Sequence, residues 1–320
     1  MPMLDMPLEK LQTYKGINPK PADFDKFWDD SLAELSTVDP DVKIAKADFQ
    51  APYADCYDLW FTGTRGGRVY AKFLKPKEVK APAPAIVEFH GLSGNSGEWH
   101  GKLPYVAAGF CVASMDCRGQ GGKSLDPGGA WGNTLNGHII RGLDDEPEKM
   151  YYRNVFLDCA RLAQIVLDMA DIDGNRVCAR GGSQGGGLTV ACAALEPRIR
   201  RAAPVFPYLS DYLRVWEMDQ DQAAYQCLRD YFRRFDPMHK RHDEVFTKLG
   251  YIDIQHLAPR IRGDIKMGTG LMDNICPPST QFAAYNKMTC QKDVVIFPDF
   301  GHEGLPDFGD INFEWFCELL

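Results

Sequence analysis

The sequence lacks the features that mark membrane proteins, low-complexity chains and cysteine-based metal sites. No apolar run approaches the roughly 18 residues that a membrane-spanning helix needs. None of its ten cysteines forms the Cys-x-x-Cys spacing of zinc or redox sites. Internal repeats are absent, and glycine and proline show no period. What remains is the composition of an ordinary soluble globular protein.

The N-terminus, the cysteines and the net charge indicate where the protein is located and what it does not bind. The first residues, Met1 to Asp5, contain no basic segment followed by an apolar one, so we expect no signal peptide and a cytoplasmic protein. Most cysteines lie in apolar stretches, where a free thiol behaves as a small hydrophobe. We expect neither disulfides nor a metal site. With 36 basic and 44 acidic side chains, the chain carries a net charge of -8, which argues against nucleic acid as a partner.

The chain has 320 residues, of which 45% are hydrophobic, enough to bury a large core in one domain or two. Near the N-terminus, the spacing of Phe24, Trp28 and Leu32 predicts an amphipathic helix over residues 22–35. Two candidate strands, Tyr57–Thr62 and Arg68–Leu74, are separated by three glycines and predict a hairpin.

From residue 84 onward, short apolar runs alternate with helix-length segments. The candidate strands are Ala85–Phe89, Phe110–Met115, Arg176–Ala179, Asp264–Gly268 and Asp293–Phe297. The candidate helices are Val155–Met169, Gly185–Leu195 and Pro278–Lys287. This alternation predicts an α/β fold with a mostly parallel central sheet and helices on both faces. Ligand chemistry in such sheets lies beyond the carboxyl ends of the strands.

Residues 207–262 interrupt the alternation with a charged and aromatic stretch that is expected to be helical. We interpret it as a helical insertion between two strands. It could form a cap over the site or a contact between subunits, because aromatic surfaces serve either purpose. The chain, residues 1–320, is then a single domain with an N-terminal helical extension and this insertion.

The segment Gly181-Gly182-Ser183-Gln184-Gly185 matches Gly-x-Ser-x-Gly, the nucleophile elbow. A nucleophile on a sharp strand-to-helix turn needs neighbours without side chains, and a candidate strand precedes this segment while a candidate helix follows it. We therefore predict that Ser183 is a catalytic nucleophile. The alternative is a glycine-rich turn with an incidental serine.

A serine hydroxyl needs a base to take its proton, and in this arrangement the chain order is serine, acid, histidine. His90, His100 and His138 precede Ser183 and are excluded as the base by that order. Three more histidines, His239, His242 and His256, lie beside charged residues in the insertion and are expected to be solvated.

His302 follows the last candidate strand in a glycine-flanked loop, and it is the predicted base. Asp273, in the loop after the preceding strand, is the predicted acid that orients and stabilises the imidazole. Asp299 is its rival, but it lies in the histidine loop itself. For the oxyanion, the donors expected are the backbone N–H groups of Gln184 and of Leu92, in the glycine-containing loop after the strand Ala85–Phe89.

Taken together, Arg118-Gly119-Gln120, the elbow at residues 181–185 and His302-Glu303 resemble the acetyl xylan esterase and cephalosporin C deacetylase family of α/β hydrolases. The resemblance runs from about Pro7 to the end of the chain. It implies the triad Ser183, Asp273 and His302, and it makes Arg118 a buried structural anchor near the site.

The same resemblance implies that the enzyme removes acetyl groups from xylooligosaccharides and cephalosporin C without metal or cofactor, as a homo-oligomer, a hexamer in this family. Small acetylated carbohydrates or cephalosporins are then the partners, without nucleic acid or membrane. One departure is Leu92, where the family often has Tyr; this change leaves the backbone donor in place but alters the acyl pocket.

Three other functions compete with this interpretation. A prolyl oligopeptidase-type peptidase shares the triad order but usually carries an N-terminal propeller, for which 320 residues leave no room. A non-catalytic binding protein on a hydrolase fold is disfavoured by the intact serine, acid and histidine set. Dinucleotide binding is weaker still, because Val205-Phe206-Pro207 stands where an acidic ribose partner would be needed.

Overall fold

The computed structural model describes residues 4–78, 82–127 and 133–320. Residues 1–3, on which the expectation of no signal peptide partly rests, lie outside this range. None of the helices in the described ranges is both long enough and apolar enough to span a bilayer.

One sheet of nine strands organises the described part of the chain, in the order β1-β2-β3-β5-β4-β6-β7-β8-β9. The bounds are β1 Lys43–Lys46, β2 Ala54–Thr62, β3 Arg68–Pro76, β4 Ala83–Phe89, β5 Cys111–Met115, β6 Ile172–Gly182, β7 Arg201–Val205, β8 Asp264–Gly270 and β9 Lys292–Phe297. β1, β2 and β3 pair antiparallel, β3 pairs antiparallel with β5, and every pair from β5 to β9 is parallel. The predicted hairpin and the mainly parallel sheet are confirmed.

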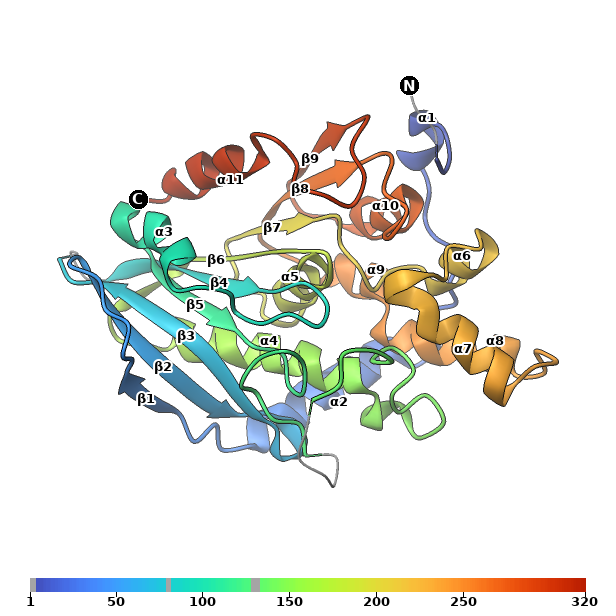
Figure 1. The fold of residues 1–320 in the computed structure, drawn as a ribbon, viewed down its shortest axis with the longest axis horizontal. Coiled ribbons are helices and arrows are strands. Elements are labelled where there is room, and N and C mark those ends of the chain that lie inside the picture. Colours follow the sequence, from blue (N-terminus) through green and yellow to red (C-terminus); the bar gives the residue numbers. More distant parts are fainter. Residues whose placement is uncertain (1–3, 79–81, 128–132) are drawn as a thin grey trace.

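Helices cover both faces of this sheet (Figure 1). Side chains alternate along β4, so Val87 joins the core under the helices α4 and α5, while Ile86 joins the core on the other face. The bounds of the principal helices are α2 Phe24–Thr37, α3 Leu103–Ala108, α4 Tyr151–Leu167, α5 Gln184–Leu195, α10 Pro278–Lys287 and α11 Phe308–Cys317. α2 packs on α4, whereas α3 and α11 contribute to the core of the opposite face.

The segment between β7 and β8 is helical, as predicted, and contains α6 Tyr212–Glu217, α7 Gln226–Phe235, α8 His242–Leu249 and α9 Ile254–Leu257. The N-terminal extension is fastened to this insertion by buried polar contacts. Asp211 accepts hydrogen bonds from the backbone of Ile17 and Asn18 at 3.0 and 2.8 Å and from the Tyr14 hydroxyl at 2.8 Å. Its own N–H donates to Asp253 at 2.9 Å.

One expectation about the insertion is wrong. His256 is buried, at 5% exposure, rather than solvated. The N-terminal extension folds over α9 and brings the Pro19 carbonyl to 3.2 Å from a ring nitrogen of His256, with the Phe24 ring at 5.6 Å. His239 remains exposed, and His242 is partly exposed.

Candidate active site

Ser183 lies between the end of β6 and the start of α5, in a conformation that few side chains adopt. Its φ is 58° and its ψ is −121°, a strained region that marks functional turns. The glycines of the turn are needed because the chain passes close to β4. A Cβ atom on Gly185 would lie 2.1 Å from the Phe89 carbonyl oxygen, and one on Gly181 would lie 2.6 Å from the same atom. The local sequence therefore builds the predicted elbow.

Ser183, His302 and Asp273 lie together at the carboxyl ends of three strands. The Nε2 atom of His302 is 2.9 Å from the Ser183 hydroxyl, and its Nδ1 atom is 2.9 Å from Asp273 Oδ2. The three residues follow β6, β8 and β9. Because these strands are parallel, their carboxyl ends lie at the same edge of the sheet, and residues far apart in the sequence come into contact there. This continuous chain of hydrogen bonds has the geometry required for proton transfer from serine to histidine.

Asp273 is held in a fixed orientation by the backbone of its own loop. The side chain is fully buried, and Oδ1 accepts hydrogen bonds from Ile275 at 2.9 Å and from Cys276 at 2.8 Å. These contacts leave Oδ2 directed at His302. The rival carboxylate, Asp299, is exposed to solvent. The arrangement therefore pairs the histidine with Asp273 and not with Asp299.

His302 is packed on one side and open on another. Its ring centroid lies 4.5 Å from that of Phe206, the first residue after β7, and the side chain remains 19% exposed. A ring that is supported in this way keeps both nitrogens in line with their partners. Its remaining exposure leaves room for a substrate beside Ser183.

The two expected oxyanion donors follow neighbouring strands. Gln184 is the first residue of α5, where backbone N–H groups have no intrahelical acceptor and carry the positive end of the helix dipole. Leu92 follows β4, which pairs with β6 so that Phe89 lies opposite Gly181. No backbone carbonyl of the described residues accepts a hydrogen bond from the Leu92 N–H. Both groups are thus available to an acceptor that enters the site.

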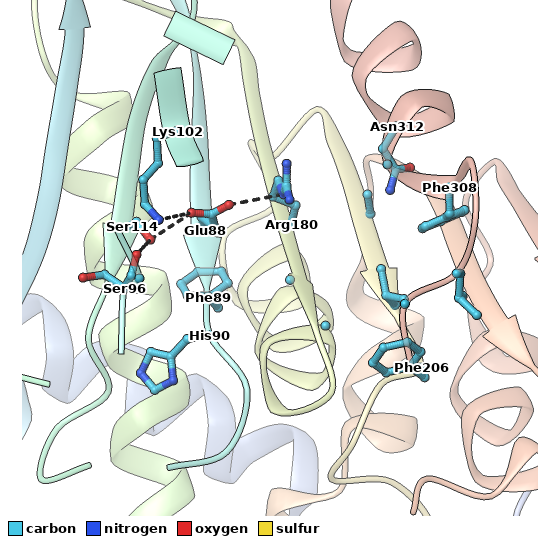
Figure 2. Close-up of a pocket in the computed structure, with 18 of the residues that line it drawn as sticks. Glu88, Phe89, His90, Ser96, Lys102, Ser114, Arg180, Phe206, Phe308 and Asn312 are labelled. Atoms are coloured by element: carbon cyan, nitrogen blue, oxygen red, sulfur yellow. Dashed lines mark hydrogen bonds and ion pairs between the residues drawn. The ribbon is translucent and has the colours of Figure 1, made fainter. Parts of the chain in front are cut away.

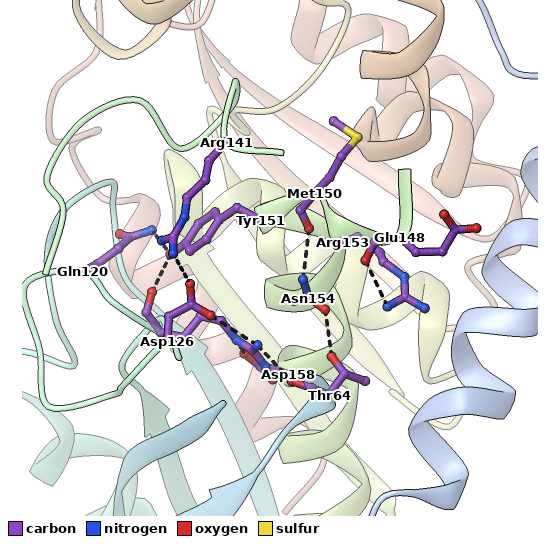
Figure 3. Close-up of polar contacts among 11 residues, drawn as sticks. Thr64, Gln120, Asp126, Arg141, Glu148, Met150, Tyr151, Arg153, Asn154 and Asp158 are labelled. Atoms are coloured by element: carbon purple, nitrogen blue, oxygen red, sulfur yellow. Dashed lines mark hydrogen bonds and ion pairs between the residues drawn. The ribbon is translucent and has the colours of Figure 1, made fainter. Parts of the chain in front are cut away.

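Gln120 connects the loop after β4 to the nucleophile elbow. The side chain is fully buried, and its Oε1 accepts from the Ser93 N–H at 2.9 Å. Its Nε2 donates to Gln184 Oε1 at 2.8 Å. The same atom donates to the Tyr151 hydroxyl at 2.9 Å, and Figure 3 shows Gln120 beside Tyr151. Gln120 therefore fixes the distance between the two segments that carry the expected oxyanion donors.

Arg118 is buried, at 1% exposure, and is fully engaged by oxygen atoms. Its Nε and Nη2 atoms contact both carboxylate oxygens of Asp158 at 2.6 and 2.5 Å, and Nη1 donates to the Thr64 carbonyl at 3.0 Å. Asp126 adds an ion pair at 3.5 Å, and all three partners lie together in Figure 3. Burial alone would lower the pKa of Arg118, but Asp158 raises it above its usual range. Gly119, with a φ of 63°, lets the chain turn directly after this anchor.

A cavity of about 420 Å³ lies behind the elbow, on the face covered by α3 and α11. Gly182 and Phe206 are among the residues that line it. Glu88 lies between Lys102 and Arg180 in its wall (Figure 2). The two cations lie 3.3 and 3.4 Å from the Glu88 carboxylate. Burial would raise the pKa of Glu88, but Arg180 and Lys102 lower it below its usual range. This charged cluster is paired internally.

A second cavity, of about 550 Å³, lies on the other side of the oxyanion loop. Leu92 and Tyr208 line it together with residues 136–138 and Ile140. The insertion contributes Ala223 and Ala224, in the short turn η4 Ala223–Tyr225, and the start of α7. The Tyr208 N–H donates to the Ser183 carbonyl at 3.0 Å, so this cavity borders the nucleophile segment. The insertion therefore forms a wall of a cavity beside the triad.

All ten cysteines are free, and seven of them are buried. One group of potential metal ligands among the described residues consists of Asp273, Cys276 and His302, whose donor atoms lie within 4.8 Å of one another. Asp273 and His302 are already hydrogen bonded to each other and to other groups in this arrangement. Burial raises the pKa of the Cys276 thiol, which disfavours the thiolate that a metal requires.

The sequence did not indicate two features of the site. Tyr152, whose hydroxyl donates to Gln184 Oε1 at 2.9 Å, has no local motif. His138 was excluded as a base by chain order, yet it is buried against Tyr151 and Tyr152 and lines the second cavity. These contacts join segments far apart in the sequence, so no short pattern could have indicated them.

Known proteins match this chain over nearly its whole length. Residues 1–319 match the family model described as Acetyl xylan esterase (AXE1). Acetyl Xylan Esterase 1 from Thermoanaerobacterium sp. JW/SL YS485 has a crystal structure with a TM-score of 0.96 and 56% identity, covering 99% of each chain. An acetyl xylan esterase from Paenibacillus sp. R4 has a TM-score of 0.92 and 34% identity, covering 98% of this chain and 100% of that one.

A curated relative, the acetyl esterase Axe7A from Xylanibacter ruminicola, is 28% identical over 290 residues. The match covers 89% of this chain and 64% of the relative, so the chain spans just under two thirds of the length of that relative. The matches confirm the predicted α/β-hydrolase fold. From the family model and these relatives together, we conclude that the chain belongs to the acetyl xylan esterase family.

Proposed function

We propose that this protein is a serine carboxylic ester hydrolase that removes acetyl groups from acetylated xylooligosaccharides through an acyl-enzyme. The observation that carries the proposal is the unbroken pair of 2.9 Å hydrogen bonds from Ser183 through His302 to Asp273. Membership of the acetyl xylan esterase family supports the choice of acetyl ester.

In the proposed reaction, His302 takes the proton from the Ser183 hydroxyl as Ser183 Oγ attacks the acetyl carbonyl carbon. The tetrahedral anion is stabilised by the N–H groups of Leu92 and Gln184, each worth on the order of 3 kcal/mol in the transition state. Asp273 holds the imidazole in the correct tautomer and stabilises the imidazolium. His302 then gives the proton to the departing sugar oxygen, and the acetyl–Ser183 ester remains.

Deacylation uses the same groups. His302 takes a proton from water, the hydroxide attacks the acetyl carbon, and Ser183 recovers its proton as acetate leaves. Gln120 and Arg118 act in this scheme as positioning residues. They hold the oxyanion loop, the elbow and the hairpin together through the contacts with Ser93, Gln184 and Thr64.

The test is acetate release from acetylated xylooligosaccharides and from p-nitrophenyl acetate. We expect Ser183→Ala to abolish both activities, whereas Ser36→Ala, on the exposed surface of α2, leaves both unchanged. Unchanged turnover by Ser183→Ala would show that another group is the nucleophile. Cleavage of aminoacyl-proline amides in preference to acetyl esters would favour the prolyl oligopeptidase-type alternative, and no hydrolysis of any of these substrates would favour a binding protein.

We infer three further properties, the first two from the family resemblance and the third from the free cysteines of the chain. The acetyl ester of cephalosporin C is a second substrate, the active form is a hexamer, and the enzyme is cytoplasmic. A panel that includes cephalosporin C and longer acyl esters tests the first and measures the effect of Leu92 on acyl range. Light scattering tests the second, since a hexamer has six times the mass of one chain and a monomer would contradict it. Fractionation of the source cells tests the third.

A further inference from the structure

His138 is a buried polar side chain without a partner. It is 2% exposed, and neither ring nitrogen makes a hydrogen bond to any residue in the described ranges. Its ring packs against Tyr151 at 4.8 Å and Tyr152 at 6.5 Å between centroids. Nearly all buried polar groups in native proteins have a partner, so an orphaned imidazole at the wall of a cavity calls for a ligand.

The charge state of His138 indicates what kind of ligand fits. Burial lowers the pKa of His138 to about 4, and the Thr134 backbone offsets this shift in part without reaching hydrogen-bonding geometry. The ring is therefore neutral near pH 7, with one N–H donor and one nitrogen acceptor. A hydroxyl group, which both donates and accepts, complements a neutral imidazole.

The position of His138 relates it to the reacting serine. It lines the same cavity of about 550 Å³ as Leu92 and Tyr208. The N–H of Tyr208 donates to the Ser183 carbonyl, and the hydroxyl of Tyr152, which packs against His138, donates to Gln184 Oε1. A group bound in this cavity is therefore beside the elbow and the loop of the expected oxyanion donors.

The size and lining of the cavity indicate which half of an ester, the acyl group or the alcohol, fits into it. Its volume is in the range of sites that hold molecules much larger than an acetyl group. Asn136 and Gln226 are exposed at this cavity, and Asp230 adds a carboxylate, whereas His138 and Tyr208 are buried. A polar lining suits an alcohol that carries several hydroxyl groups and does not suit a long aliphatic acyl chain.

We propose that this cavity binds the alcohol half of the ester, a hydroxylated sugar, and that His138 hydrogen bonds one of its free hydroxyl groups. The proposal rests on the proposed esterase function and adds a specificity-determining residue to it. The insertion supplies part of this subsite through Gln226 and Asp230.

The test compares two esters that differ in the alcohol. Acetylated xylobiose carries free hydroxyl groups on its leaving group, and p-nitrophenyl acetate carries none. His138→Phe keeps an aromatic ring against Tyr151 and Tyr152 but removes both nitrogens, and His138→Asn restores a donor and an acceptor. His242→Phe, on α8 and absent from the lining of this cavity, is the matched control.

We expect His138→Phe to lower kcat/KM for acetylated xylobiose about tenfold. Its kcat/KM for p-nitrophenyl acetate should stay within about twofold of the parent enzyme, and His138→Asn should recover part of the loss. Equal losses on both esters would assign His138 a structural role and overturn the proposal. An undiminished kcat/KM for acetylated xylobiose in His138→Phe would overturn it as well.

A binding measurement separates failure of this inference from failure of the proposed function. Without any esterase activity in the parent enzyme, the proposed function fails, and calorimetric titration with xylobiose still tests the subsite. We expect xylobiose to bind the parent protein about tenfold more tightly than His138→Phe. Equal binding by the two proteins, or no binding by either, would overturn the inference. Thermal melting of each variant confirms that the comparison is made on folded protein.

Discussion

Asp158 and Asp273 are both fully buried aspartates, and they differ chiefly in their partner. Asp158 faces the guanidinium of Arg118 through two short hydrogen bonds. Asp273 faces the imidazole of His302 through one, with its second oxygen held by backbone N–H groups. A guanidinium keeps its charge at all accessible pH values, whereas an imidazole gains and loses a proton near neutrality.

Under the proposed mechanism, this difference separates a structural ion pair from a catalytic pair. The Arg118–Asp158 pair stabilises one arrangement of the hairpin, α4 and the loop after β5, and it does not change during the reaction. In the proposed reaction, the His302–Asp273 pair changes its charge in each cycle, and the histidine remains partly exposed. Burial and residue type alone do not distinguish the two carboxylates, but the identity of the partner side chain does.

The largest effect is expected on kcat, when Asp273 is replaced. Asp273→Asn removes the charge that stabilises the imidazolium and permits the wrong tautomer, so kcat for p-nitrophenyl acetate should fall roughly 10⁴-fold. The melting temperature should change much less than it does in the Asp158 variant. A kcat within tenfold of the parent enzyme would contradict the assigned role of Asp273.

The next largest effect is expected on stability, when Asp158 is replaced. Asp158→Asn leaves the Arg118 guanidinium buried without its counter-charge, which should lower the free energy of unfolding by about 3–5 kcal/mol. Activity per folded molecule should stay close to that of the parent. The double variant Arg118→Met with Asp158→Leu should recover much of the stability, because it removes both charges. Urea unfolding monitored by circular dichroism measures the free energy of unfolding of each variant. A loss of activity in Asp158→Asn as large as that in Asp273→Asn would contradict a purely structural role for Asp158.

A third buried aspartate, Asp253, extends the comparison, because its neighbour is another carboxyl group, that of Asp211. Burial and the negative charge of Asp211 raise the pKa of Asp253 to about 7 from an ordinary 3.8. The folded state therefore holds this proton more tightly than the unfolded state. Its contribution to stability is fully present below about pH 4 and is lost as the pH rises to about 7.

Replacing Asp253 by Asn should remove this pH dependence. Between pH 4.5 and 7.5, chosen to span most of the window between the two pKa values, the variant should gain roughly 2–4 kcal/mol of unfolding free energy relative to the parent. Denaturant unfolding at the two pH values gives the comparison. A stability difference between parent and variant that is the same at both would show that Asp253 does not titrate in this range.

The smallest effect concerns Gln120, which links the two segments that carry the proposed oxyanion donors. Gln120→Leu removes the acceptor of the Ser93 N–H and the donor to Gln184, so the loop after β4 should lose its fixed position. We expect kcat/KM for acetyl esters to fall about tenfold to a hundredfold, largely through kcat. Steady-state kinetics measure the change. A rise in KM alone would indicate a role in binding rather than in positioning.

The sequence could indicate Ser183, Asp273 and His302, which the structure brings into contact, because each of them has a local context. Gly-x-Ser-x-Gly follows a strand, Asp273 lies in the loop after β8, and His302 lies between glycines after β9. These loops all follow parallel strands, so they lie at the same edge of the sheet and the three residues come together there. The alternating β4 and the helix α5 were predictable for the same local reason. The helix expected at residues 22–35 is offset by only two residues, at Phe24–Thr37.

The features that escaped prediction depend on contacts between distant segments. Arg118 lies 40 residues from Asp158, and no local pattern encodes that ion pair. His256 is buried only because the N-terminal extension folds over it, and His138 only because two tyrosines of α4 pack against it. Strand β1 was missed because all four of its residues are exposed, so it shows no hydrophobic alternation.

Covalent labelling tests most directly whether Ser183 is a nucleophile activated by His302 and Asp273. The enzyme is treated with a fluorophosphonate probe and digested, and the peptides are analysed by mass spectrometry. We predict labelling at Ser183, its loss in Ser183→Ala, and a strong decrease in its rate in His302→Ala and Asp273→Asn. Labelling of another residue, or no labelling of an enzyme that hydrolyses p-nitrophenyl acetate, would contradict the account.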